Sequence, residues 1–207
     1  MFSRRKFSLL LLACSALALH AVTARADSFT FSGSFIQDDN IQFFNFNLAN
    51  NVLVTLRTTS YAGGLNADGS ITSAGGFDTI LTLFNSAGNL VASNDDGPGG
   101  TADAGMSLFL PPGSYMLALT QYDNFINGPT LSAGFSRAGQ GNFTGVVFGP
   151  GSGSFIDFNG NQRTANWTVN IENVSAATVV PEPASLLLMG TSLAGLAASM
   201  WRRRNRG

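Results

Sequence analysis

Short runs in which apolar and polar residues alternate are the feature that most constrains how this chain folds. In Phe29–Phe35, Ile41–Leu48 and Val52–Thr58, apolar side chains recur at every second position and so share one face of a β-strand. Further runs of this kind lie at 79–85, 90–93, 107–110, 115–121 and 165–174. Turn-forming clusters of Gly, Asn, Ser and Pro separate them, and no segment of 27–180 has a convincing helical period. The pattern predicts an all-β fold, an antiparallel β-sandwich.

The first 26 residues have the layout of a secretory signal peptide. A basic start is followed by a short apolar stretch, which we expect to be helical, and by the small-x-small sequence Ala24-Arg25-Ala26. Cleavage is therefore expected between Ala26 and Asp27. A leader that stays in the membrane as an anchor is the alternative, which the short apolar run disfavours. The predicted domains are the signal peptide at 1–26, an exported domain at 27–178 and a C-terminal segment at 179–207.

The exported domain is acidic and lacks three reactive side chains. Three arginines against eleven acidic residues give residues 27–180 a net charge of −8, and they contain no Cys, His or Lys. This composition excludes a Ser-His-Asp triad, a thiolate nucleophile, imidazole or thiolate metal ligands and disulfide bonds. Its charge disfavours nucleic acid as a partner. We expect no enzyme; a hydrolase that pairs Asp95 or Asp96 with another acid is the weaker alternative.

Carboxylates gather in the loops next to the predicted strands. Asp39 lies between the first two strands, Asp78 directly precedes a strand, and Asp95 and Asp96 follow the next one. Alternate loops of an antiparallel sandwich meet at the same end, where these oxygens would suit Ca²⁺. The same residue types also favour turns, because their side chains bond to nearby backbone groups. A calcium site and solvated turn carboxylates are therefore both open.

The C-terminal segment combines three parts in a fixed order: the triplet Pro181-Glu182-Pro183, a mostly apolar run at 184–201, and a basic tail at 202–206. The run is about 27 Å long as a helix, near the lower limit for crossing a bilayer. This order resembles the PEP-CTERM sorting signal of Gram-negative bacteria. The resemblance implies a transient single-pass precursor in the inner membrane, which an exosortase cuts near the triplet before the protein reaches the cell surface or medium. A plain C-terminal anchor is the alternative.

The exported domain also resembles a known family through "FSGSFIQDDNIQFFNFNL", "GGFDTILTLFNSAGNLVASNDDG" and "LPPGSYMLALTQYDNF". These stretches are similar to those of exosortase-sorted proteins whose core is like the bacterial pre-peptidase C-terminal domain, a jelly-roll-like sandwich. The resemblance implies a stand-alone, non-enzymatic surface or extracellular-matrix protein, associated with exopolysaccharide or biofilm. A calcium-stabilised adhesion or carbohydrate-binding module is the alternative. Four loop aromatics are candidates for stacking on sugars, unless they are packed inside: Tyr61, Phe77, Tyr122 and Phe125.

Overall fold

The computed structural model describes residues 27–181, which form strands and loops with very little helix. The strands are β1 (Asp27–Ser34), β2 (Gln42–Leu48), β3 (Val52–Thr58), β4 (Gly64–Leu65), β5 (Ile71–Thr72), β6 (Thr79–Asn85), β7 (Leu90–Asn94), β8 (Gly105–Leu110), β9 (Gly113–Gln121), β10 (Asn166–Val174) and β11 (Ala176–Val180). The helical turns are η2 (Leu131–Ala133) and α2 (Thr144–Val147). Neither of the two predicted terminal helices falls within the described residues. Among those residues, no helix is long and apolar enough to cross a membrane.

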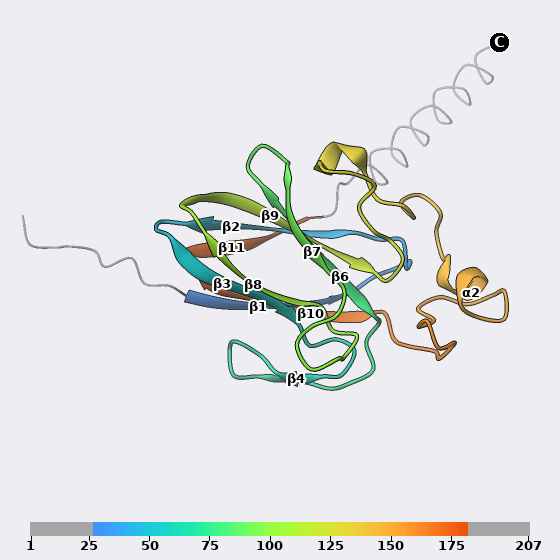
Figure 1. Cartoon of the computed structure of the whole chain (residues 1–207). Coiled ribbons are helices and arrows are strands. Elements are labelled where there is room, and N and C mark those ends of the chain that lie inside the picture. The colour runs from blue at the N-terminus through green and yellow to red at the C-terminus, as the bar shows by residue number, and fades with distance from the viewer. Residues whose placement is uncertain (1–26, 182–207) are drawn as a thin grey trace, which may run out of the picture.

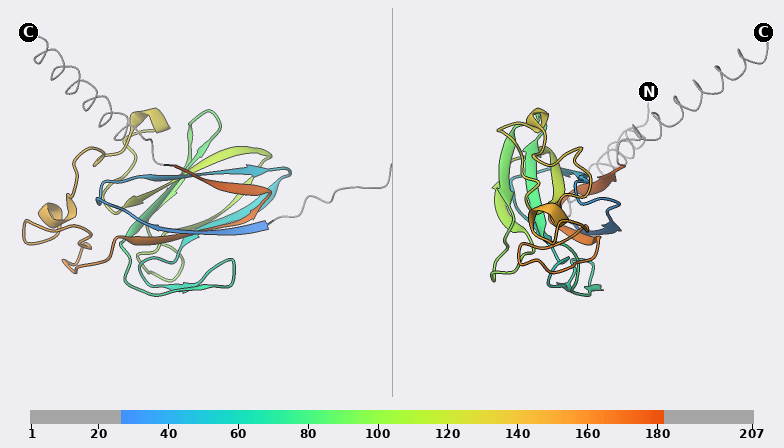
Figure 2. Two further views of the ribbon diagram at one scale, coloured as in Figure 1. Left: turned by 180° about the vertical axis from the view of Figure 1, so that it is seen from behind. Right: turned by 90° about the vertical axis from the view of Figure 1, so that its right-hand side faces the viewer.

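Two antiparallel sheets make up the body of the domain (Figures 1 and 2). Sheet A has the strand order β1-β10-β3-β8, and sheet B has the order β11-β2-β9-β6-β7. Every strand pair within these sheets is antiparallel. A small third sheet joins β4 to β5, and α2 lies beyond one end of the sandwich (Figure 1). The predicted all-β antiparallel sandwich is therefore confirmed.

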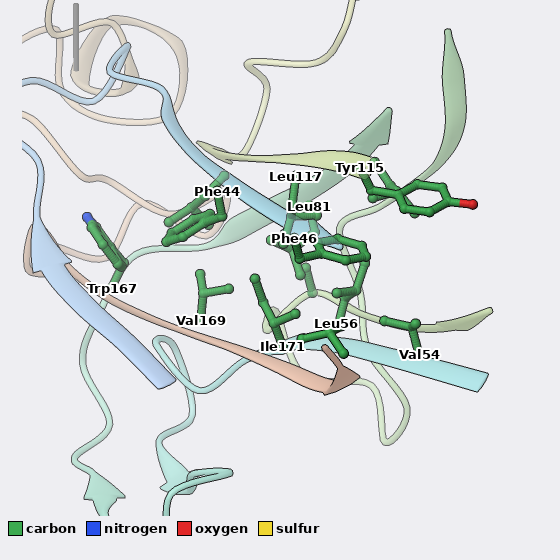
Figure 3. Close-up of a cluster of buried hydrophobic side chains, with 14 of the residues drawn as sticks. Phe44, Phe46, Val54, Leu56, Leu81, Tyr115, Leu117, Trp167, Val169 and Ile171 are labelled. Carbon is green, nitrogen blue, oxygen red and sulfur yellow. The ribbon is translucent and has the colours of Figure 1, made fainter. Parts of the chain in front are cut away.

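The core lies between the two sheets, as the period-two pattern requires. Alternate side chains of β2, β6 and β9 face alternate side chains of β3 and β10 (Figure 3). The fully buried members include Phe44, Phe46, Val54, Leu56, Leu81, Leu117, Val169 and Ile171. At one end of the core Gly33 lies against the ring of Trp167, and a Cβ on this glycine would come within 2.3 Å of the indole. Any larger residue at 33 would therefore displace the tryptophan.

The outer face of sheet B carries a second, smaller apolar cluster. Phe84 and Ala118 point away from the main core, and the long loop at 122–140 covers them with Phe135. The backbone fastens this loop to the β6–β7 hairpin, since Leu90 N donates to Pro129 O and Leu131 N donates to Gly88 O, both at 2.8 Å. The loop is thus a fixed cover over part of the sheet.

Three strands were not predicted from the pattern. The two-residue strands β4 and β5 lie inside a stretch without alternation, and buried Asn66 holds them by bonding to the hydroxyls of Thr59, Ser70 and Thr72. The third is β11, which pairs with β2 from Ala176 to Val180. The predicted boundary between residues 178 and 179 therefore falls inside a strand.

Candidate functional site

The sorting triplet begins where the folded domain ends. Strand β11 is the edge strand of sheet B, and its last residue, Val180, is fixed by a 2.7 Å hydrogen bond from Gln42 Nε2 to its carbonyl. Pro181 follows directly, and because it has no N–H it cannot extend the strand pairing. Glu182 and Pro183 lie outside the described residues, as does Ala26 at the predicted leader cleavage site, whereas Asp27 begins β1. No flexible spacer separates the sandwich from the first residue of the triplet.

Three of the four predicted calcium ligands flank the same hairpin at one end of sheet B. Asp78 directly precedes β6, while Asp95 and Asp96 directly follow β7, and these two strands pair as an antiparallel hairpin. Asp78 is buried, and its Oδ1 atom has no hydrogen-bond partner among the described residues. Asp95 is half-buried and Asp96 is exposed. The hairpin therefore places a buried carboxyl group near one half-buried and one exposed carboxylate.

This arrangement makes Asp78 difficult to ionise. Burial, the largest cause, and the negative charges of Asp96 and Asp95 together raise its pKa from 3.8 to about 8. The three arginines of the described residues are all engaged with other groups. Arg57 pairs with Glu172, Arg137 pairs with Asp123, and Arg163 stacks on Tyr61 with its Cζ atom 3.7 Å from the ring centre. The acidic group formed by Asp78, Asp95 and Asp96 therefore lacks an internal cation.

Asp39, the fourth predicted ligand, holds a different loop. Its Oδ2 atom accepts a 2.8 Å hydrogen bond from Gly141 N, and its Oδ1 atom is buried without a partner among the described residues. It is not among the charges that chiefly raise the pKa of Asp78, which are those of Asp96, Asp95, Asp157 and Asp103. Within residues 27–181, no three acidic side chains lie close enough together to hold a metal ion. The structure thus supplies a partial ligand set at Asp78 and not a closed one.

Two further carboxylates serve the fold and are not among the four predicted ligands. Asp38 is fully buried and accepts hydrogen bonds from the backbone N–H groups of Phe143, Thr144 and Phe155. Asp103 does the same for a second loop by accepting from the N–H groups at 60, 61 and 62. Several buried N–H groups that converge on one carboxylate mark an anchoring role. Their donors lie 41 or more residues away in sequence, so no local signal identifies them.

The loop aromatics divide into buried and exposed groups. Phe77 is fully buried in the core, and the ring of Tyr61 is covered by Arg163, so neither is free to stack on a sugar. Tyr122 is half-buried and contacts three other rings, those of Phe125, Phe148 and Phe158. Burial raises the pKa of Tyr122, and the charges of Asp95 and Asp78 raise it further. An aromatic cluster with solvent-exposed edges therefore borders the acidic group.

Comparison with known proteins identifies the C-terminal segment. Residues 179–204 match the family described as the PEP-CTERM protein-sorting motif. Residues 179–204 therefore carry a PEP-CTERM sorting motif, which implies export and processing by an exosortase. The match begins at Val179, within β11, so the last two residues of the folded domain are also the first two of the motif.

The exported domain has a more distant likeness. It is similar to the crystal structure of the pre-peptidase C-terminal domain of a collagenase from Bacillus anthracis, with a TM-score of 0.35 and 14% sequence identity. The match covers 74% of this chain and 91% of that domain. At this level of similarity the match carries no argument about function. A comparison with curated protein sequences found no significant match.

Proposed function

We propose that this chain is a non-enzymatic surface protein that associates with exopolysaccharide of the extracellular matrix after exosortase processing. The observation that carries the proposal is the direct passage from β11 into the sorting motif. Because no spacer intervenes, cutting at the triplet would separate the sandwich directly from the apolar run and the basic tail. An acidic domain without His, Cys or Lys offers binding surfaces in place of the usual nucleophiles and bases.

Cell fractionation tests this role. We expect most of the protein in the matrix fraction of polysaccharide-producing cells, and in the culture medium of an isogenic strain that makes no polysaccharide. A matched control carries the segment 179–207 on an unrelated exported domain, and it should appear in the medium of both strains. Equal distribution of the protein between matrix and medium in the two strains would contradict the proposal.

A second candidate function, a calcium-stabilised module, is favoured by one specific observation: the buried Oδ1 atom of Asp78 has no partner among the described residues. The candidate ligands are Asp78, Asp95 and Asp96, whose side chains would have to move closer together than they lie here. The remaining positions of the coordination sphere would need backbone oxygens or water. Because the acidic side chains of residues 27–181 do not form a complete metal site, we rank the calcium function below matrix association.

The acidic group predicts a defined pH dependence of stability. The folded pKa of Asp78, about 8, lies above its ordinary value of 3.8, so between these values the folded state binds more protons than the unfolded state. The contribution of Asp78 to the free energy of unfolding therefore falls as pH rises through this interval and levels off above it. The difference in urea-unfolding free energy between the wild type and Asp78→Asn, measured across the interval in the full chain, isolates this contribution.

Calcium should restore the stability that the protein loses as pH rises to the Asp78 pKa of about 8, because above this pH Asp78 is ionised and can bind the metal. At a concentration about 100-fold above its Kd, Ca²⁺ would add about 2.7 kcal/mol to the unfolding free energy of the wild type. It should leave the unfolding free energy unchanged in the Asp78→Asn variant and in the double variant that combines Asp95→Asn with Asp96→Asn. If Ca²⁺ leaves wild-type stability unchanged, the calcium function is wrong while the pH dependence stands.

A further inference from the structure

A groove of about 500 Å³ opens on the outer face of sheet B, beside the part that the long loop covers. Its floor comes from Asn45 and Asn47 of β2 and from Met116 of β9. The β6–β7 turn and Leu131 of the covering loop form one wall, and Thr178 of β11 forms the opposite side. The size is within the range of roughly 300–1,000 Å³ that is typical of ligand sites.

The groove offers uncharged groups of two kinds. None of its lining residues is acidic or basic, and asparagine, serine and threonine side chains supply hydrogen-bond donors and acceptors. Met116 and Leu131 supply apolar surface, and both pack against the cluster under the covering loop. Neutral amides and hydroxyls can hydrogen-bond to the hydroxyl groups of a ligand, and the apolar patches can pack against its C–H groups.

The amides on the floor are available to a ligand. Asn45 is exposed, and its side chain has no hydrogen-bond partner among the described residues. The Oδ1 atom of Asn47 accepts a 2.7 Å hydrogen bond from Ser114 Oγ, which orients the amide and leaves its Nδ2 donors without a partner in the same part of the chain. Asn85 differs, because its Oδ1 atom accepts from the N–H groups of Ala87 and Asn89 and so serves its own turn.

The frame of the groove is rigid. Asn45 stands opposite Met116 on one neighbouring strand and opposite Thr178 on the other, so paired strands fix the three side chains across the floor. The wall is held by the 2.8 Å hydrogen bond from Leu131 N to Gly88 O. A preformed site of this kind binds a ligand without the entropic cost of ordering its own backbone.

We infer that this groove binds an uncharged polysaccharide chain. The inference rests on the proposed matrix function and names the site and the ligand class for it. The hydroxyl groups of the polymer would bond to the amides of Asn45 and Asn47 and to the hydroxyl of Thr178, while its C–H faces pack on Met116 and Leu131. Anionic polymers are disfavoured, because the groove has no basic residue and the domain carries a net charge of −8.

Isothermal titration calorimetry with the full chain in a non-glycosidic detergent tests the inference. The probes are cellohexaose, laminarihexaose and maltohexaose as neutral chains and hexamannuronate as the anionic chain. We expect at least one neutral hexasaccharide to bind, and Asn45→Ala or Thr178→Ala to weaken it roughly tenfold through a lost hydrogen bond. The matched controls are Asn50→Ala, in the exposed β2–β3 turn, and Thr55→Ala, on β3 of sheet A, which should leave affinity unchanged.

Each result decides the inference. Neutral binding that the groove variants weaken and the control variants do not supports it. Neutral binding that none of the groove variants changes, binding of hexamannuronate at equal strength, or no binding of any neutral hexasaccharide overturns it. Cell fractionation decides the matrix function separately, so a protein that is retained by polysaccharide through another surface would keep that function and lose this site.

Discussion

Replacing Asp38 with alanine should destabilise the domain by at least about 3 kcal/mol, because it strips several buried donors of their common acceptor. The Oδ1 atom of Asp38 accepts from Phe143 N at 2.7 Å, and its Oδ2 atom accepts from Phe155 N at 3.0 Å and from both donors of Thr144. The partners lie between 105 and 117 residues away, so this one carboxylate fastens the loop that carries α2. Alanine would leave these donors buried without a partner.

Urea unfolding of the full chain measures the effect, and hydrogen exchange at the Phe143 and Phe155 amides locates it. Asp38→Asn should recover part of the loss, because its single oxygen can still accept while its amide nitrogen cannot. The matched control is Asp68→Ala, which removes an exposed carboxylate that bonds to Ser70 within its own turn and should cost less than about 1 kcal/mol. A loss for Asp38→Ala as small as the control's would show that Asp38 is not the anchor.

The alternation of the sequence was enough to predict the body of the fold. Strands β3 and β6 have the predicted bounds, because each keeps an apolar pattern that begins and ends at turn residues. Strand β11 was missed because "AATVV" is short and directly precedes a motif with another role. Strands β4 and β5 depend on the buried side chain of Asn66, which bonds across the loop, and a polar residue in a loop gives no sign of such burial.

For the acidic residues, the sequence predicted positions along the strands but not the roles of the individual side chains. Position in the chain predicted that Asp78, Asp95 and Asp96 lie at the same end of the sheet, because they flank consecutive strands that pair as a hairpin. Within residues 27–181, however, no three acidic side chains come close enough to hold a metal ion. The adjacent pair Asp38 and Asp39 could not be told apart, since their roles depend on Gly141 and Phe143, about a hundred residues away. The groove could not be predicted from the sequence, because its lining residues come from β2, β6, β9, β11 and a loop that only the tertiary fold brings together.

The second large effect concerns the sorting triplet. Replacing Pro181-Glu182-Pro183 with three alanines should abolish release of the protein and leave the sandwich folded, because the strand pairing of β11 ends at Val180. Pro181 has no N–H, so the pairing of β11 cannot continue through it into the triplet. A matched control, Ala176→Ser, alters an exposed residue of β11 four positions before Val180 and should be released like the wild type.

The intact mass of the extracellular protein tests the account most directly. In cells with an exosortase, we predict a chain that retains β11 through Val180 and has lost the apolar run and the arginines, so the mass should place its C-terminus close to the triplet. In cells from which the exosortase gene is deleted, and for the triple-alanine variant, the chain should remain with the cells and keep the apolar run at 184–201 and the basic tail at 202–206. An extracellular protein that still carries this run and tail, or one whose mass is the same with and without the exosortase, would contradict the account.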